Sequence, residues 1–321
     1  MTKYVFKRLL LMIVALFCIS TICFVMIRLL PMTPPDGATV EQKKQIADIW
    51  EARGYNEPIL VQYGIYLRDI FTEFDFGTSW KIRQTIPATE VFIPKLLPTV
   101  IVNLYSLIIS IPLGIAFGIF AAIKKNKWQD HFISTMVMLF VSVPSYVYAF
   151  LVQYFLYFKL DLFPPTISSL TDAGGSWFSW IMFTSMIPPI LALSFGEIAG
   201  LCRFTRAELT ETLTSDYMLL ARTKGLTRSQ ATTRHALKNA MVPILPMIIS
   251  SFIGILGGSM IIEQIFQIPG VGQLYVEAVT QLDYDIFMLD SIFYTFVSLL
   301  AGIVVDISYG FIDPRIRMGE R

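Results

Sequence analysis

Residues 215–246 read SDYMLLARTKGLTRSQATTRHALKNAMVPILP, a polar stretch between two apolar runs that are each long enough to cross a membrane. The pair Ser215–Asp216 suits the start of a short amphipathic helix, because Ser caps helix N-termini and Asp favours their positive end. Gly225 suits the left-handed residue that ends such a helix. Thr227 and Gln230 have the capping-box spacing of a second helix. The pattern predicts two short helices on which a cytoplasmic partner can push, moving the spans attached to them.

The composition is that of a membrane protein. Of 321 residues, 55% are apolar and 15% are charged, whereas soluble domains carry about 25% charged residues. The formal net charge of +1 argues against nucleic acid as a partner. Cys18, Cys23 and Cys202 fall in or beside apolar runs, so a disulfide framework is not expected. The two histidines lack the His-Glu-x-x-His pattern, which disfavours an intramembrane metalloprotease.

Six apolar segments are long enough to span a bilayer, which takes roughly 20 residues in a helix. The first is too long for the apolar core of a signal peptide and is taken as a span. Lys and Arg gather before the first segment, after the second, between the fourth and fifth, and in the C-terminal tail. Since basic residues stay inside, both termini are expected to be cytoplasmic. The expected spans are approximately residues 9–30, 96–123, 132–158, 180–202, 241–263 and 287–308.

The expected fold class is therefore an all-α membrane protein with six transmembrane helices. We expect an N-terminal transmembrane helix at 1–30, an external helical segment at 31–94, and a five-helix core at 95–321 with a cytoplasmic coupling loop at 203–240. Thr39 suits the N-cap of a helix in the external segment. That segment is too short for an independent enzyme domain.

Prolines and polar residues within the spans mark a candidate translocation path. Pro112, Pro144 and the pair Pro188–Pro189 are expected to interrupt their spans, and broken helices line the cavities of transporters. Ser145 follows Pro144, and Asn103 is a candidate cavity group in the second span. A static kink with packing value only is the competing interpretation of each proline.

Acidic residues inside spans are expensive and therefore informative. Glu197 lies in the fourth span, where it could meet the amino terminus of a peptide or pair with Arg203 or Arg206 further along. Glu263 and Asp306 are interpreted as structural groups that cap a helix or pair with a neighbouring subunit.

A set of short motifs runs along essentially the whole chain. In order they are Lys7–Leu10, Arg28–Pro31, Pro58–Tyr63, Asp75–Ser79, Leu97–Thr99, Ile111–Gly114, Val143–Ser145, Arg203–Arg206, Leu220–Gly225, His235–Leu237, Asn239–Ala240, Pro243, Glu263–Phe266, Pro269–Gly272 and Asp313–Arg317. Together they resemble the permeases of ABC importers, most closely the dipeptide, oligopeptide and nickel branch. The broader family begins its coupling loop with Glu-Ala-Ala. Here Leu219 and Leu220 stand at the first two positions, and only Ala221 and Gly225 match that pattern.

The resemblance implies the type I ABC-importer permease fold in a bacterial cytoplasmic membrane, with no catalytic role for this chain. It implies two ATPase subunits or domains that bind ATP and Mg, a second homologous permease, an extracytoplasmic substrate-binding protein and a peptide substrate. External surfaces such as Ile268–Gly272 would receive the binding protein. The chain itself lacks a Gly-x-x-x-x-Gly-Lys-Ser/Thr phosphate loop, and no cofactor is expected in it. The residues carried to the ATPase contact are Tyr217, Leu220, Ala221, Lys224 and Gly225.

Three alternatives stay open at this point. A permease of the same branch could carry nickel or another small solute, although the chain is poor in His and Cys. An ion-driven secondary transporter would more often show internal repeats, and none is evident. An intramembrane hydrolase would need a nucleophile motif such as Gly-x-Ser-x-Gly, which the chain lacks.

Overall fold

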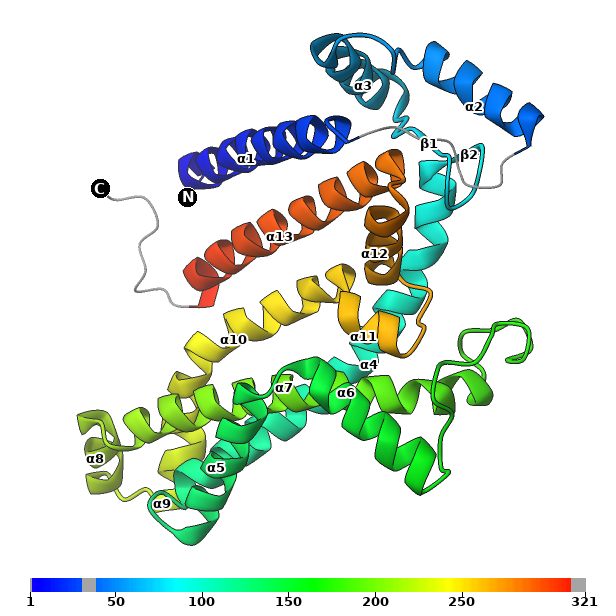
Figure 1. Ribbon diagram of the computed structural model, residues 1–321. Coiled ribbons are helices and arrows are strands. Elements are labelled where there is room, and N and C mark those ends of the chain that lie inside the picture. The colour runs from blue at the N-terminus through cyan, green and yellow to red at the C-terminus, as the bar shows by residue number, and fades with distance from the viewer. Residues whose placement is uncertain (1, 31–38, 313–321) are drawn as a thin grey trace.

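The computed structural model describes residues 2–30 and 39–312, and most of these residues are helical (Figure 1). The motif Asp313–Arg317 and the remaining basic residues of the tail lie outside the described residues. The long elements are α1 (Thr2–Arg28), α4 (Ala88–Ile123), α5 (Trp128–Ser142), α7 (Trp180–Leu213), α10 (Leu237–Gly254) and α13 (Tyr284–Ile312). The shorter ones are α2 (Val40–Ala52), α3 (Ile59–Glu73), β1 (Thr78–Ser79), β2 (Ile86–Pro87), α6 (Ser145–Gln153), η1 (Tyr154–Lys159), α8 (Asp216–Thr223), α9 (Arg228–Ala231), η2 (Thr232–Ala236), η3 (Ile255–Gly257), α11 (Met260–Ile265) and α12 (Val271–Gln281).

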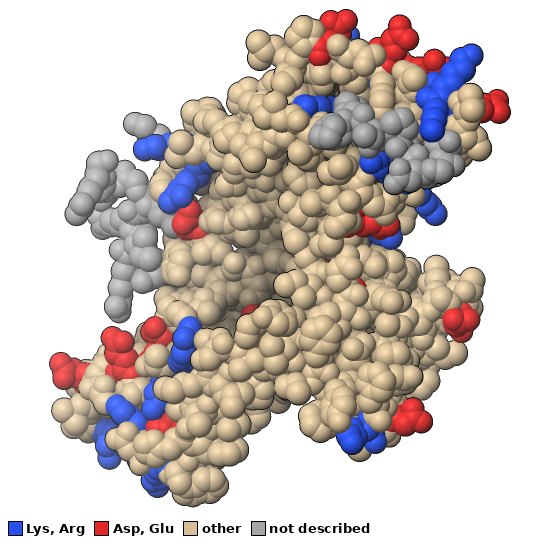
Figure 2. Space-filling model, viewed as in Figure 1, with Lys and Arg blue, Asp and Glu red and all other residues tan. Residues whose placement is uncertain are grey.

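The helices lie in layers. α1 packs on α13 and α13 on α10, while α4 and α7 form the most extensive helix pair and α5 and α6 cover α7. In Figure 1 the start of α1, the ends of α7 and α13, and α8 lie on the left, whereas α2, α3 and the start of α4 lie on the opposite side. Figure 2 shows the same division in the surface: charged side chains collect at these ends and the band between them is almost free of charge.

The membrane-spanning class is confirmed. Five described helices are long and apolar enough to cross a bilayer, or six if the pair α5–α6 forms one bent span. The break expected at Pro144 in the span at 132–158 is confirmed, because the two parts of this span meet at an angle of 101°. Pro144 is the N-cap of α6, with φ −60 and ψ 145. The preceding helix ends before Pro144, because the residue before a proline is biased away from helical geometry.

The other predicted proline breaks are wrong. Pro112 lies inside α4, and Pro188–Pro189 lies inside α7, and both helices continue through them. The fifth span has a break that was not predicted. It lies at Gly258, which has φ +60 and separates η3 from α11. Gly tolerates this left-handed conformation because it has no Cβ.

Two glycines bring α4 and α7 into backbone contact. A Cβ placed on Gly114 would lie 2.7 Å from the Cβ of Leu201, and one on Gly118 would lie 2.5 Å from the Cβ of Thr205 and 2.8 Å from the carbonyl oxygen of Cys202. The two glycines have the Gly-x-x-x-Gly spacing, a sequence signal for close helix packing in membranes that was not among the predictions above. The two helices are therefore held in close contact at Gly114 and Gly118.

The external segment is attached by Asp283, which is 0% exposed. Its Oδ2 accepts hydrogen bonds from the Ser79 hydroxyl at 2.7 Å and from three successive backbone N–H groups, those of residues 80, 81 and 82, at 3.2, 3.1 and 3.0 Å. Burying a carboxylate is costly unless such donors compensate. The loop after β1 is thus wrapped around the residue that precedes α13.

Asp285 holds the end of α1 in the same region. It accepts from the Tyr55 hydroxyl at 2.6 Å and the Thr78 N–H at 3.0 Å, and its Oδ1 lies 3.4 Å from Arg28 Nη2. Burial and the Asp285 carboxylate raise the pKa of Tyr55 well above its usual value, so that its hydroxyl stays a donor. The predicted cap at Thr39 is confirmed as a capping box with Gln42 at the start of α2.

We expect Gly118→Leu to destabilise the chain by about 1–3 kcal/mol, because the new side chain overpacks a tight helix contact. Gly196→Leu is the matched control, since a Cβ at Gly196 meets nothing within 4 Å on the same helix pair. Thermal unfolding in detergent measures the difference. Equal melting temperatures for the two variants would contradict the close approach of α4 and α7.

Candidate functional site

The coupling segment forms as two short helices after α7. α8 begins at Asp216, Lys224 is its C-cap, and Gly225 follows with φ +91. The predicted capping box of Thr227 and Gln230 is confirmed. From α9 the chain continues through η2 into α10 and the membrane. The local turn chemistry was therefore readable from the sequence, including the left-handed Gly225.

One predicted cap is different. Ser215 stands at the N-cap position of α8, but its hydroxyl caps no α8 amide. It donates instead to the carbonyl of Thr212 at 2.6 Å. Ser215 therefore bonds back to the end of α7, at the turn that joins the two helices.

The inner face of α8 is packed into the permease. Met218 is 4% exposed and Ala221 is 7% exposed. Both belong to a buried cluster that joins the ends of several helices beside α8, namely Ala122 of α4, Leu209 of α7, Ala231 of α9, Ala236 of η2 and Ala240 of α10. Small alanines let these backbones approach closely. Any displacement of α8 is consequently passed to several helices at once.

The outer face of α8 presents apolar and basic side chains without a partner in the described residues. Tyr217, Leu219 and Leu220 are 38%, 64% and 55% exposed, and Lys224 and Gly225 are exposed as well. Exposed apolar groups clustered on a short helix are typical of a protein contact surface. Four of the five predicted coupling residues thus face outward, whereas Ala221 faces inward and supports the helix.

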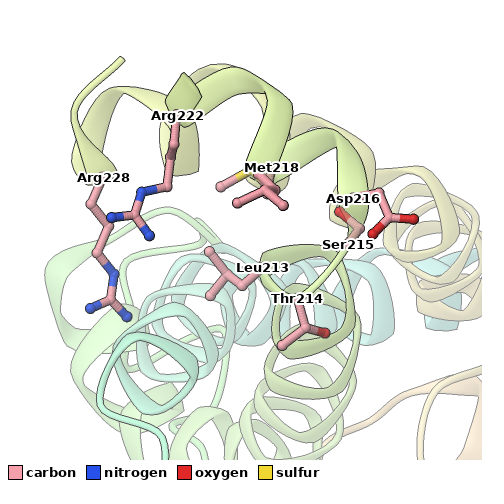
Figure 3. Close-up of a pocket in the computed structure, with 8 residues that line it drawn as sticks. Leu213, Thr214, Ser215, Asp216, Met218, Arg222 and Arg228 are labelled. Atoms are coloured by element: carbon pink, nitrogen blue, oxygen red, sulfur yellow. The ribbon is translucent and has the colours of Figure 1, made fainter. Parts of the chain in front are cut away.

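A groove runs along one side of α8, between this helix and the end of α7 (Figure 3). Its volume is about 320 Å³. In Figure 3 the side chains of Arg222 and Arg228 lie at one end, Asp216 lies at the other, and Leu213 and Met218 point into the space between. The two arginines could not be predicted as neighbours from the sequence, because only folding places residues of α8 and α9 on one groove.

An ion pair braces the base of α7. Arg206 donates from Nε and Nη2 to the two carboxylate oxygens of Asp130 at 2.5 and 2.9 Å, and Asp130 also accepts from the N–H of Asn126 at 2.9 Å. This bidentate geometry connects α7 to the start of α5. The alternative pairing of Glu197 with Arg206 is therefore wrong.

Glu197 is brought to a different helix. Its Oε1 accepts a hydrogen bond from the Ser251 hydroxyl of α10 at 2.6 Å, and the carboxylate forms no ion pair with any described basic residue. The Asn103 amide donates to the carbonyl of Thr99 in its own helix at 2.8 Å. Pro144 and Ser145 are exposed at the bend between α5 and α6. The four candidate path residues thus have separate environments, and Glu197 alone bridges two spans through its side chain.

The external loop is arranged differently from expectation. Ile268 and Val271 are 1% and 0% exposed, and Gly270 and Gly272 are buried, so most of the predicted docking loop cannot be touched from outside. Pro269 is half-buried and lines a second groove, of about 400 Å³. Other residues around that groove are Arg83, Lys95, Trp177 and Glu277.

Glu263 explains why this loop is buried. Its Oε1 accepts from the Thr99 hydroxyl at 2.9 Å and its Oε2 from the N–H of Gln273 at 3.0 Å, while Thr99 accepts from the N–H of Val271 at 2.9 Å. The structural role predicted for Glu263 is confirmed. Asp306 is also structural, but it pairs with Arg8 of its own chain at 2.9 Å rather than requiring a neighbouring subunit.

Comparison with known proteins identifies relatives along the whole length. Residues 114–318 match the family described as the binding-protein-dependent transport system inner membrane component, and residues 1–86 match its N-terminal region. The dipeptide transport system permease protein DppB of Lactococcus lactis is 35% identical, with 99% of this chain and 100% of that protein covered. DppB of Bacillus subtilis is 30% identical over 100% of both chains. The glutathione transport system permease protein GsiC of Salmonella paratyphi A is 32% identical over 99% of both.

Two adjacent residues of α8, one buried and one exposed, should differ in how much their truncation changes stability. We expect Met218→Ala to destabilise the coupling segment by about 2–5 kcal/mol, because it opens a cavity in a buried cluster. Leu219→Ala removes an exposed side chain and should change stability by less than about 0.5 kcal/mol. Hydrogen exchange of the α8 amides, with thermal unfolding in detergent, measures both. Equal losses would show that α8 is rotated from the orientation described above.

Proposed function

The chain belongs to the binding-protein-dependent transport family of inner membrane components and is a membrane-spanning subunit of an ABC importer, and from this we propose that its cargo is a short peptide. Relatives named for dipeptide and glutathione transport support a peptide cargo.

The observation that carries the mechanism is the two-sided packing of α8. Its inner face is buried against helices that enter the membrane, and its outer face exposes Tyr217, Leu219 and Leu220. We propose that this outer face lies in a groove of an ATPase subunit, with Lys224 and Gly225 at the edge of the contact. ATP and Mg then bind to the ATPase partners, and the permease performs no covalent chemistry.

Motion would pass through the packed helices as rigid bodies. Closure of two ATPase domains displaces α8, and the buried cluster transfers the displacement to α7 and α10. Because α4 is locked to α7 at Gly114 and Gly118, these two helices move together. The permease would form half of the path and a second homologous permease the other half, opening outward on ATP-driven closure and resetting after hydrolysis.

We also propose the orientation in the membrane. The start of α1, the end of α13 and α8 lie on one side in Figure 1, and seven Lys and Arg fall between Arg203 and Lys238 on that side. Basic loops stay cytoplasmic, so both termini would be cytoplasmic in a bacterial inner membrane. The external helices α2 and α3 and the external groove at Pro269 would face the substrate-binding protein.

The assembly can be tested by purifying the tagged chain in mild detergent and identifying its partners by mass spectrometry. We expect a second six-span permease and an ATPase with phosphate loops. Gly225→Asp should lose the ATPase, because it adds a carboxylate and local backbone strain at the proposed contact, where Gly225 has φ +91. It should keep the overall fold, because nothing lies within 4 Å of a Cβ at this position.

Proteoliposomes containing the purified complex then test the cargo and the energy source. Peptide uptake should require ATP and the binding protein. Uptake that ignores ATP and follows an ion gradient would establish a secondary transporter instead. ATP-dependent uptake of nickel without peptide uptake would keep the importer and replace its cargo.

Glu197 is the residue we propose for contact with the peptide amino terminus. Glu197→Gln keeps a hydrogen-bond acceptor for Ser251 but removes the charge, so uptake should fall about tenfold, equivalent to ~1.4 kcal/mol. Ser251→Ala is the control, since it removes the hydroxyl and keeps the carboxylate. Initial uptake rates at saturating binding protein measure the effect. A normal rate for Glu197→Gln would exclude Glu197 from the path.

A further inference from the structure

The groove beside α8 combines opposite charges at its two ends with an apolar centre. Arg222 and Arg228 lie at one end and Asp216 at the other in Figure 3, and Leu213 and Met218 point into the middle. Resting on the docking role proposed above, we propose that the groove receives a segment of the ATPase subunit that places an acidic side chain between the two arginines and an apolar side chain beside it.

The two arginines lack a counter-charge in the part of the chain that the structure describes. The five ion pairs found there use Arg8, Arg28, Arg53, Arg68 and Arg206, and none involves Arg222 or Arg228. Two guanidinium groups at one end of a groove repel each other. A carboxylate inserted between them would attract both groups and offset this repulsion. Arginine is also the residue best suited to a bidentate carboxylate contact.

The position of Arg228 supports a role outside the chain. It is the first residue of α9, whose helix continues through η2 into α10. Cations are disfavoured at helix N-termini and favoured at C-termini. Arg222, in the last turn of α8, gains from that effect, whereas Arg228 does not. An anion supplied by a partner protein would offset the unfavourable placement of Arg228.

The charge pattern selects a protein partner over a membrane surface. Anionic lipid would satisfy Arg222 and Arg228 but would be repelled by Asp216 at the other end. A folded partner can place an acid at one end, a base or hydroxyl at the other, and an apolar group over Leu213 and Met218. Leu219 adds to this because it is 64% exposed and belongs both to the groove lining and to the outer face of α8.

The two arginines also make one end of the proposed cytoplasmic contact positively charged. On the permease side, the groove contributes two cations, Arg222 and Arg228, and the neighbouring Leu219 carries no charge. The complementary acid must then come from the ATPase. Contact at the groove would load the end of α7 directly, in addition to the load that α8 passes through its buried face.

Charge reversal provides the first arm of the test. In the complex, Arg222→Glu combined with Arg228→Glu should reduce co-purified ATPase at least about tenfold, since close interfacial charge pairs are strongly coupled. Arg234→Glu combined with Lys238→Glu is the matched control, because both side chains are exposed in the same cytoplasmic segment and the net charge change is identical. Monodisperse elution and an unchanged melting temperature show that each variant is folded.

Zero-length crosslinking provides the second arm. Arg222→Lys or Arg228→Lys places an amine at the groove, and a carbodiimide joins it to a carboxylate only when the two are in contact. We expect an amide bond to an Asp or Glu of the ATPase, located by mass spectrometry, and none for the control Arg234→Lys. This arm works even if charge reversal weakens the fold.

The outcomes separate this proposal from the proposed function. A wild-type chain that recovers no ATPase would overturn both. Recovery of ATPase by the wild type, with equal recovery by the groove and control variants or no groove crosslink, would overturn the groove alone and leave the importer intact. Loss of binding to phosphatidylglycerol vesicles by the groove variants, with ATPase recovery unchanged, would assign the arginines to lipid and overturn the protein contact.

Discussion

The backbone contact between α4 and α7 is the constraint on which the rest of the permease depends. Lipid tails are as apolar as leucine side chains, so burial alone does not hold helices together in a bilayer, and close packing has to do so. Gly114 and Gly118 allow α4 to approach the Leu201 and Thr205 turns of α7. α7 in turn carries Glu197 toward α10, Arg206 toward α5 and α8 at its end. A pair of helices locked in this way can transmit a push without bending.

The two ends of the molecule are held by different chemistry. On the coupling side, small apolar contacts of Ala221, Ala231 and Ala236 with Met218 accompany the bidentate ion pair of Arg206 and Asp130. At the end that carries α2 and α3 the contacts are made by buried carboxylates: Asp283 and Asp285 bind segments about two hundred residues away in sequence, and Glu263 joins α11 to Thr99 of α4. Directional hydrogen bonds fix orientation more strictly than alanine contacts do. Several buried carboxylates thus hold the end that carries α2 and α3, whereas the buried contacts of α8 itself are apolar.

The bend between α5 and α6 and the break at Gly258 interrupt two of the expected spans. Irregular backbone at membrane depth is tolerated where protein or a water-filled cavity surrounds it. The break at Gly258 leads directly into α11 and the buried Glu263, so it redirects the chain beneath the external loop. The surface in Figure 2 is hollowed between the layer of α1 and α13 and the layer of α5 to α7. A second permease packed against this face would enclose the hollow.

The sequence by itself determined most of the long helices and the two capping boxes, at Thr39 and Thr227. Hydrophobic runs of membrane length located the spans, and Thr227, Gln230 and Gly225 defined the coupling helices, because such signals depend on residues a few positions apart. The short motifs, in their order along the chain, also indicated the family. The sequence could not determine which proline bends a helix, because neighbours decide whether freed carbonyls are satisfied. It could not give the partners of Glu197 and Arg206, or the groove shared by Arg222 and Arg228. Those contacts join different helices, and only tertiary packing sets the distance and rotation between helices.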